Sequence, residues 1–590
     1  MRNFLLVLLL ASGFAAHAQT TLFRNVRLFD GERVGGPRDV LVRDGVIAAV
    51  SSKIEAPAGA TVIDGTGKTL LPGFIDAHTH TWGDALRTAL AFGVTTELDM
   101  FTGYSFVKAM KEEQAAGKAN GRADLFSAGT LVTAPGGHGT EYGMTIPTIT
   151  KAEEAQAFVD ARIAEGSDYI KIVLDDGHTY GMKMPTVSAE VLKAVVDAAH
   201  ARKKLAVVHV GDLAGARAAM NAGADALVHL FVDVQPDAAF GRDAAKRRMF
   251  VTPTLTVLMS VTGTSGGGTL ANDARMTPYL TKPELAQLQQ SFPRRPGQPP
   301  VHYSAAVASV KQLRAAKVPI LAGTDAGNPG TAHGSALHRE LELLVEAGLT
   351  PTEALVAATS APARAFALAD RGRVAKGLRA DLLLVNGDPT TDITATRDIA
   401  GIWKGGVPFD RAAYAKSVAT ANAATGAKPA GLDSGAISDF NDGTMKAAFG
   451  AGWMLSTDAV AGGKSTGDLS VADGALVVRG TIVGPLPYAW SGAMFSPAAV
   501  PFQPADVSSK KAVRFRAKGD GKTYRVMLFT TSTGYTPLVK TFTGGADWTD
   551  HTFPIASFGN IDGRDLTAII FAGGPEPGDF ELRLDDVRLE

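Results

Sequence analysis

Four histidines and one aspartate of the 590-residue chain are of the residue types that bind divalent metal ions, and most of them are far apart in the sequence. His78 and His80 stand one residue apart at the end of the apolar run "LLPGFIDAHTH". Alternate residues of a strand point to the same face, so both imidazoles can face one site. The others also come late in apolar runs: His209 in "LAVVHV", His229 in "ADALVHLF" and Asp325 in "PILAGTDAG". A single histidine there is usually a core residue, but the five together indicate a metal site.

Lys171, in "DYIKIVLDDG", is the most informative residue of the set. A lysine inside a central strand is buried, and an uncompensated buried ammonium is costly and tends to lose its proton. The neutral amine can react with carbon dioxide to form a carbamate, an anion whose two oxygens can bridge two metal ions. The alternative is an ammonium that pairs with Asp175 or Asp176, or that reaches the rim of the strand. Charge favours the carbamate, because an ammonium would add to the charge of the cations.

Eight apolar strands alternate with helical stretches in residues 73–371. Continuous apolar strands separated by helices predict a parallel sheet covered on its faces. Eight such units predict a (β/α)8 TIM barrel, whose active site lies at the carboxyl ends of its strands. An open doubly-wound sheet would need a glycine-rich phosphate turn after its first strand, and none is present. The strands are "GFIDAHTH", "GVTTELDM", "DLFSAGTLVTA", "YIKIVLDD", "LAVVHV", "ADALVHLF", "MFVTPTLTVL" and "VPILAGTDAG".

Short strands with alternating polar and apolar residues flank this α/β part on both sides. We expect residues 19–72 and 372–414 to join in one small composite β-sandwich. Residues 415–436 are rich in Ala, Gly, Pro and Lys, which indicates a linker. Residues 437–590 consist of short alternating strands, which predict a separate all-β domain of the jelly-roll type.

The first residues indicate an exported protein. Arg2 precedes an apolar core, and "AHA" at 16–18 is a cleavage site, so residues 1–18 are typical of a signal peptide. We therefore expect a periplasmic or secreted location. The apolar run is too short to span a bilayer, and no other stretch predicts a membrane span. The net charge of −1 gives no reason to expect a nucleic-acid partner, and the absence of cysteine excludes disulfides and thiolate metal sites.

The motifs that hold the candidate metal ligands resemble those of the amidohydrolase superfamily, in particular its imidazolonepropionase-like and prolidase-like members. The resemblance covers about residues 20–410 and implies a binuclear centre. It places His78, His80 and Asp325 on one metal ion and His209 and His229 on the second, with carboxylated Lys171 as the bridge. Zinc is the first choice for two divalent ions, with manganese, cobalt, nickel and iron as alternatives.

The resemblance implies a metal-dependent hydrolase that cleaves an amide or other C–N bond of a small molecule by a metal-activated hydroxide. The substrate would be an N-acyl amino acid, an Xaa-Pro-like dipeptide or a cyclic amide, and Asp325 would transfer the proton. His138 in "GGHG" and His178 in "DDGHTYG" are candidate substrate-binding residues. Gly211 stands where prolidase-like relatives often carry a tyrosine, which leaves the substrate open. The same centre could serve a lactonase or organophosphate esterase.

The C-terminal strands resemble the domain of the mitochondrial complex I intermediate-associated protein, which is a galactose-binding-like jelly roll. The resemblance rests on Trp453, Asp458 and the "GGKS" turn at 462–465. A stabilising module, a carbohydrate-binding module and a module that binds a protein partner all stay open, because fold alone does not fix function. A non-catalytic binding or assembly protein that acts through this domain is a further alternative, and a homo-oligomer is also open.

Overall fold

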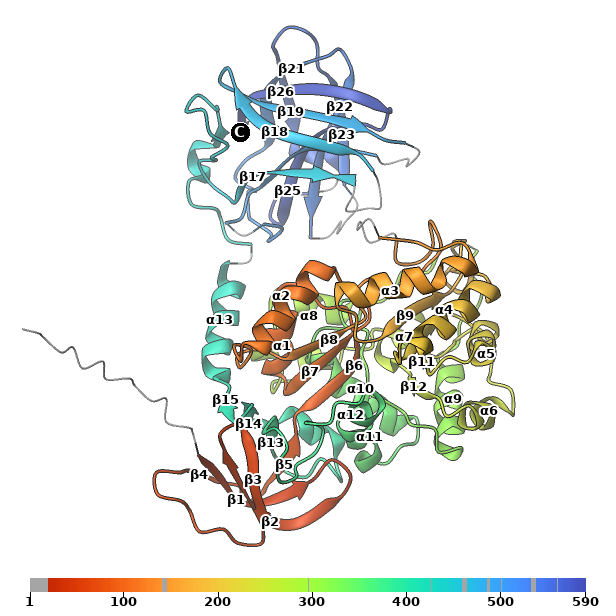
Figure 1. Cartoon of the computed structure of the whole chain (residues 1–590). Coiled ribbons are helices and arrows are strands. Elements are labelled where there is room, and N and C mark those ends of the chain that lie inside the picture. Colours follow the sequence, from red (N-terminus) through yellow and green to blue (C-terminus); the bar gives the residue numbers. More distant parts are fainter. Residues whose placement is uncertain are drawn as a thin grey trace, which may run out of the picture.

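The computed structural model of the chain describes residues 20–140, 146–295, 297–424, 426–458, 464–484, 489–499, 501–531, 537–559 and 561–590. The expected signal peptide, residues 1–18, lies outside them. Figure 1 shows a small sheet at the N-terminal end, an α/β part and, beyond helix α13, an all-β part. No helix in the described residues is long and apolar enough to cross a membrane.

Strands from both flanks of the α/β part form one eight-stranded sheet. The strand order is β15-β14-β13-β5-β1-β2-β3, with β4 also paired to β1. Most neighbours are antiparallel, but β1 is parallel to β4 and to β5, so the sheet is mixed. Strands of both flanks thus join in one sheet, Val46 of β3 bridges to Arg379, and one core contains side chains of both flanks, so the expected sandwich stays a prediction. The members of the sheet are β1 (Thr21–Phe29), β2 (Val34–Arg43), β3 (Val46–Ser51), β4 (Thr61–Asp64), β5 (Lys68–Pro72), β13 (Leu382–Asn386), β14 (Ile399–Lys404) and β15 (Val407–Pro408).

The α/β part contains two parallel sheets, with the orders β6-β7-β8 and β12-β11-β10-β9. Every residue of β6, β7, β10, β11 and β12 is buried, which explains the unbroken apolar runs in the sequence. The strands are β6 (Phe74–Thr79), β7 (Val94–Asp99), β8 (Asp124–Ser127), β9 (Ile170–Leu174), β10 (Ala206–Val210), β11 (Ala226–Val228) and β12 (Phe250–Thr252).

Single parallel bridges pair the edge strands β6, β9 and β12 with residues outside both sheets at three points. Val132 pairs with Ile172 of β9, Val251 of β12 pairs with Ile320, and Thr79 of β6 pairs with Ala326. The expected eighth strand, "VPILAGTDAG", forms only such isolated bridges and is not a strand of either sheet. The prediction of eight regular strands is therefore not met, since seven form ladders and the segment 318–326 makes single contacts.

Twelve helices of the described residues accompany these strands, and Figure 1 shows them around the outside of the parallel sheets. In α4, Val191, Leu192, Val195, Val196 and Ala199 form a buried stripe, as expected for an amphipathic helix. One prediction was wrong: "MFVTPTLTVL" is not one strand, because β12 ends at Thr252 and a helix follows. The helices are α1 (Ala85–Ala91), α2 (Tyr104–Ala115), α3 (Ala155–Glu165), α4 (Ala189–Ala201), α5 (Leu213–Ala222), α6 (Phe240–Lys246), α7 (Leu255–Val261), α8 (Lys282–Gln289), α9 (Tyr303–Ala315), α10 (Ser335–Glu346), α11 (Pro351–Ala357) and α12 (Ser360–Ala365).

The segment expected to be a linker begins as a helix. Helix α13 (Arg411–Ala424) packs on the α/β part, where the Tyr414 hydroxyl donates to Thr88 Oγ1 and Arg411 Nε donates to the carbonyl of Ala91. Two antiparallel sheets follow, and one core contains buried side chains of both. Their strands are β16 (Ala436–Ser438), β17 (Gly452–Thr457), β18 (Thr466–Ala472), β19 (Ala475–Ile482), β20 (Ser491–Ser496), β21 (Ala512–Gly519), β22 (Thr523–Thr530), β23 (Leu538–Thr543), β24 (Thr549–Pro554), β25 (Leu566–Gly573) and β26 (Gly578–Leu589).

The residues that carry the C-terminal resemblance hold loops together. Asp458 accepts hydrogen bonds from the backbone N–H of Ser465 at 2.9 Å, from its hydroxyl at 2.6 Å and from Trp490 N at 3.2 Å. Trp453 Nε1 donates to Ser438 Oγ at 2.9 Å. These buried bonds give the motif a structural explanation. The two glycines of its turn lie outside the described residues.

A buried ion cluster joins the small sheet to the α/β part. Asp124, at the start of β8, lies 2.7 Å from Arg371, 3.2 Å from Arg379 and 2.7 Å from Lys404 of β14. Lys404 is fully buried and also contacts Asp381 at 3.2 Å. Because these charges have little access to water, removal of one partner leaves the others poorly compensated.

We predict that Asp124→Asn destabilises the α/β part by about 3–5 kcal/mol, because it leaves buried cations without their shared anion. Denaturant unfolding followed by far-UV circular dichroism measures the change. Asp160→Asn is the matched control, since Asp160 pairs with Arg202 at the surface and such pairs contribute about 1 kcal/mol or less. Equal effects of the two substitutions would contradict the structural role of the cluster.

Candidate metal centre

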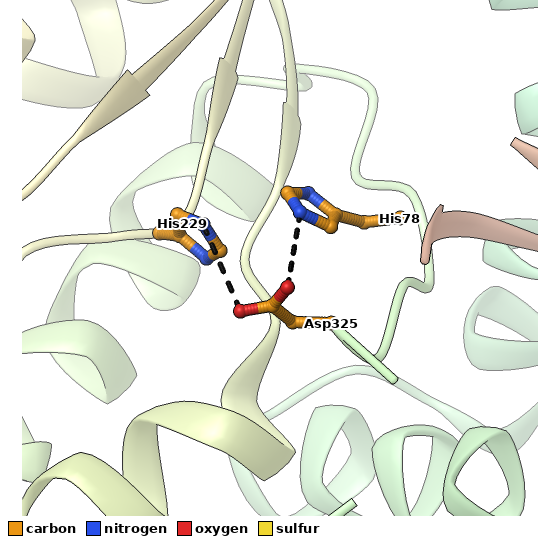
Figure 2. Close-up of side chains that lie close together, drawn as sticks. All are labelled: His78, His229 and Asp325. Atoms are coloured by element: carbon orange, nitrogen blue, oxygen red, sulfur yellow. Dashed lines mark ion pairs between the residues drawn. The ribbon is translucent and has the colours of Figure 1, made fainter. Parts of the chain in front are cut away.

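Asp325 lies at the centre of a group of buried imidazoles. Its Oδ1 is 3.2 Å from His78 Nε2 and 3.0 Å from His80 Nε2, and its Oδ2 is 3.9 Å from His229 Nε2. Figure 2 shows His78 and His229 facing the carboxylate from two sides. Both histidines thus lie at one carboxylate, as their spacing predicts, with His78 in β6 and His80 directly after its end at Thr79.

The backbone positions two of these side chains in a conformation that sequence patterns do not reveal. His229 directly follows β11 and has a φ of 66°, and Asp325 has a φ of 58°. Left-handed backbone is uncommon for residues other than glycine and is found preferentially at functional sites. Hydrogen bonds fix both positions: Asp325 N donates to the carbonyl of His78 at 2.8 Å, and His229 N donates to that of Thr252 at 3.0 Å.

His209 completes the group of imidazoles. It lies in β10, and its ring centroid is 4.6 Å from that of His229. Its Nε2 lies 3.1 Å from Asp175 Oδ2, and a carboxylate only accepts, so this nitrogen carries the proton and Nδ1 keeps its lone pair. A carbonyl also only accepts, so the contact of His80 Nδ1 with the carbonyl of Phe101 at 3.3 Å favours a proton on Nδ1, and in that tautomer the lone pair is on Nε2, which faces Asp325 at 3.0 Å.

Lys171 lies in β9 with 2% of its surface exposed. Burial lowers the pKa of its ammonium to about 7, although Asp325 and Asp99 oppose the shift. The carboxylates considered as its partners are engaged elsewhere, Asp175 with His209 and Asp176 with His178. No side chain in the described part of the chain hydrogen-bonds the Lys171 amine.

The histidines of this group are held in the neutral form that metal binding requires. Burial lowers the pKa of His78 to about 3 and that of His209 to about 4, and it holds the pKa of His229 well below the usual value. Burial alone would raise the pKa of Asp325, but the adjacent rings of His78 and His229 outweigh it, and the carboxylate stays ionised.

Several buried ligand atoms at this point make no hydrogen bond of suitable geometry. They are both ring nitrogens of His78 and Oδ1 of Asp325, although His78 Nε2 lies 3.2 Å from that oxygen. Buried polar atoms are normally satisfied, because an unpaired one costs about 1–3 kcal/mol. His78, His229 and Asp325 each offer an atom within 4.8 Å of the others, which is close enough for candidate metal ligands. The donor set fits a divalent metal ion.

The two candidate substrate residues differ in position. His138 approaches the centre, with its ring centroid 4.9 Å from that of His209. His178, in the short 3₁₀ turn η2 (His178–Tyr180), is half exposed and lies 2.6 Å from Asp176 and 3.6 Å from Asp212. His138 therefore lies beside the candidate ligands, whereas His178 belongs to a separate cluster with Asp176 and Asp212.

A buried acidic network beside the ligands was missed in the sequence. Asp99 accepts from Thr81 N at 2.8 Å, and Glu97 accepts from the Thr81 hydroxyl at 2.9 Å and faces His333 Nδ1 at 3.0 Å. Asp76 accepts from the Thr324 hydroxyl at 2.7 Å and so ties β6 to the segment that carries Asp325. The sequence contained a signal for this network, because Asp76, Glu97 and Asp99 lie inside predicted strands. Acidic side chains are rarely buried there unless they have a partner.

We predict a pH-dependent difference between the metal-free parent and a His78→Asn variant. The unfolded chain protonates this histidine near pH 6.5, whereas the folded protein does so only near pH 3, so the parent loses stability as the pH falls. The variant lacks this loss. As the pH falls from 6.5 to 4, the free energy of unfolding of the variant, relative to that of the parent, should therefore rise by about 1.4 kcal/mol per pH unit. Burial raises the pKa of Glu340 to about 7, so this group also makes stability depend on pH. Its contribution is the same in both proteins and cancels in the difference.

Denaturant unfolding at pH 7, 6 and 5 in the presence of chelator measures this difference. His338→Asn serves as control, because burial also lowers the pKa of His338 to about 3 at a position away from the candidate ligands. It should give the same slope. A stability difference between His78→Asn and parent that is constant from pH 7 to 5 would show that His78 is not held neutral.

Comparison with known proteins agrees with this chemistry. An imidazolonepropionase of Deinococcus deserti is 28% identical over 399 residues, which cover 62% of this chain and 90% of that protein. An ochratoxinase of Aspergillus niger is 26% identical over 430 residues, which cover 63% and 82%. The solved structure of a Xaa-Pro dipeptidase with methionine in its active site has a TM-score of 0.54 at 22% identity, over 66% of this chain and 100% of the other, and it shares the fold.

Family models match both larger parts of the chain. Residues 439–567 match Complex I intermediate-associated protein 30 (CIA30), so the C-terminal resemblance is confirmed. Residues 69–408, more than half of the chain, match the Amidohydrolase family, whose members depend on metal ions. The chain therefore belongs to the amidohydrolase family, and it is a hydrolase that acts on carbon–nitrogen bonds.

Proposed function

We propose that the two parallel sheets and segment 318–326 together form a closed eight-stranded (β/α)8 barrel. The three isolated bridges support this, because one pairs β9 with Val132, a little after β8, and the other two pair β12 and β6 with segment 318–326. Backbone hydrogen bonds add to them: Val132 N donates to the carbonyl of Lys171, and Ala77 N donates to that of Ala322. In such a barrel the candidate ligands lie at the carboxyl ends of the strands, where barrel enzymes hold their active sites.

The centre of this barrel would hold two divalent metal ions, with zinc as the first choice. The ligands would be His78, His80, His209, His229 and Asp325, with Lys171 as a bridging carbamate. The single observation that carries the proposal is the set of buried atoms of His78 and Asp325 that have no hydrogen-bond partner. Burial lowers the pKa of the Lys171 amine to about 7, which favours its neutral form. This supports carbamate formation, because only the neutral amine reacts with carbon dioxide.

The reaction would be hydrolysis of an amide or related C–N bond in a small molecule. Bound metal ions supply Lewis-acid activation of the attacking water and of the scissile carbonyl. Asp325 would take the proton of the water and deliver it to the leaving nitrogen, since its carboxylate stays ionised at the centre of the site. His138, beside His209, would orient the substrate. The substrate would be an N-acyl amino acid, an Xaa-Pro-like dipeptide or a cyclic amide, and the name of the Xaa-Pro dipeptidase that shares the fold supports the dipeptide.

Export of the chain, to the periplasm or the medium, belongs to the same proposal. It rests on the sequence of residues 1–18 alone. A hydrolase outside the cytoplasm would act on small amides that the cell takes up or encounters.

Lys171→Ala should abolish stable binding of both metal ions, because the proposed carbamate of Lys171 would supply a ligand to each of them. Metal analysis of the purified protein, combined with intact mass, measures the effect, with about two ions per chain expected in the parent. Lys193→Ala, which removes a lysine paired with Asp197 at the surface, should leave the metal content unchanged. Full metal occupancy in Lys171→Ala would rule out the carbamate bridge.

The parent should hydrolyse members of a panel of N-acyl amino acids and Xaa-Pro dipeptides. With the same substrates, Asp325→Asn should lower kcat by about 10²–10⁴-fold, because it removes the group that transfers the proton. Release of the amine, measured by chromatography, follows the reaction. The panel also contains lactones and phosphotriesters. Turnover of these esters with no turnover of any amide would reject amide hydrolysis and favour the esterase alternative.

A further inference from the structure

Thr254 lies directly behind one of the proposed ligands. It follows β12, is fully buried and has a φ of 51°. A β-branched residue in the left-handed region is a true outlier, because its side chain crowds the backbone there. Such a conformation persists only where the surroundings impose it, and it is found preferentially at functional sites.

The hydroxyl of Thr254 has one proton, and its contacts show where that proton goes. Oγ1 donates to the carbonyl of Pro253 at 2.8 Å, and a carbonyl can only accept. His229 Nδ1 lies 2.7 Å from the same oxygen. Because the hydroxyl proton is already used, Nδ1 must donate to Oγ1. His229 is then the tautomer with its proton on Nδ1, and its Nε2 keeps a lone pair toward Asp325.

Glu340 holds the backbone next to Thr254. This carboxylate comes from α10 and is fully buried. Its Oε1 accepts from Leu255 N at 2.9 Å, and its Oε2 accepts from Thr256 N and from the Thr256 hydroxyl, both at 2.8 Å. Three hydrogen bonds thus fix the two residues after Thr254, which restricts the backbone angles available to Thr254 itself.

We propose that Thr254 is a positioning residue for His229: its hydroxyl selects the tautomer and orientation in which His229 Nε2 can bind a metal ion, and Glu340 acts through it. This inference rests on the proposed metal centre and adds residues that do not touch the metal ion themselves. Hydrogen bonds of this kind to the far nitrogen of a histidine ligand typically change metal affinity by 10–100-fold.

Two variants of Thr254 separate the hydroxyl from the shape of the side chain. Thr254→Val keeps the branched shape but removes the acceptor, and Thr254→Ser keeps the acceptor but removes the methyl group. Zinc affinity is measured for the full chain by competition with a chromophoric chelator, with Zn²⁺ as the only added ligand. The melting temperature of each metal-free protein is recorded in parallel, so that loss of folding is distinguished from loss of binding.

We expect Thr254→Val to bind zinc about 10–100-fold more weakly than the parent, and Thr254→Ser to stay within about threefold of it. Thr254→Val that binds as tightly as the parent, or Thr254→Ser that is as weak as Thr254→Val, would overturn the inference. A parent that binds no zinc would contradict the proposed metal centre itself, and the inference with it. These outcomes are distinct in one titration series.

Glu340→Gln tests the second half of the proposal. If Glu340 acts through Thr254, zinc affinity should fall in Glu340→Gln, and the double variant with Thr254→Val should be no weaker than Thr254→Val alone. Losses that multiply in the double variant would show that Glu340 acts by another route. Glu346→Gln is the control, because this half-exposed residue of the same helix pairs with Arg339.

Discussion

The site depends on one electrostatic constraint, which is the burial of Asp325 among neutral imidazoles. A buried carboxylate normally needs a cation or a set of donors, and buried imidazoles normally need hydrogen bonds. Here Asp325 Oδ1 and the nitrogens of His78 lie close together but make no hydrogen bond of suitable geometry. The protein therefore keeps a group of donor atoms in a state that a divalent cation would satisfy. The strands and the hydrogen bonds behind them are the means by which that state is held.

The elements around this point follow from the constraint. Fully buried strands bring His78, His209 and His229 to one place, and left-handed backbone at His229 and Asp325 turns two of the side chains inward. Behind the imidazoles, Asp175 fixes the proton on His209 and Thr254 fixes the proton on His229. Farther out, the Asp124–Lys404 cluster joins the small sheet to the α/β part.

The residue types and their positions in apolar strands were enough to predict the group of candidate ligands and the amidohydrolase resemblance. His78 and His80 gave the pair by strand alternation, and His209, His229 and Asp325 each end an apolar run. The supporting residues could not be predicted, because Thr254 and Glu340 meet only through tertiary contacts. Reading "MFVTPTLTVL" as one strand also hid the turn at Thr254. The segment 318–326 looked regular from composition alone, although its pairing depends on neighbours on both sides.

The most direct test of the metal centre is anomalous diffraction at the zinc absorption edge, from crystals of the full chain grown with Zn²⁺. We predict two peaks, one at bonding distance of about 2.0–2.2 Å from His78, His80 and Asp325, and the other at that distance from His209 and His229. Density that extends from the Lys171 amine between the two peaks would be the carbamate. Crystals with no peak at these residues, or with zinc only at surface sites, would contradict the account.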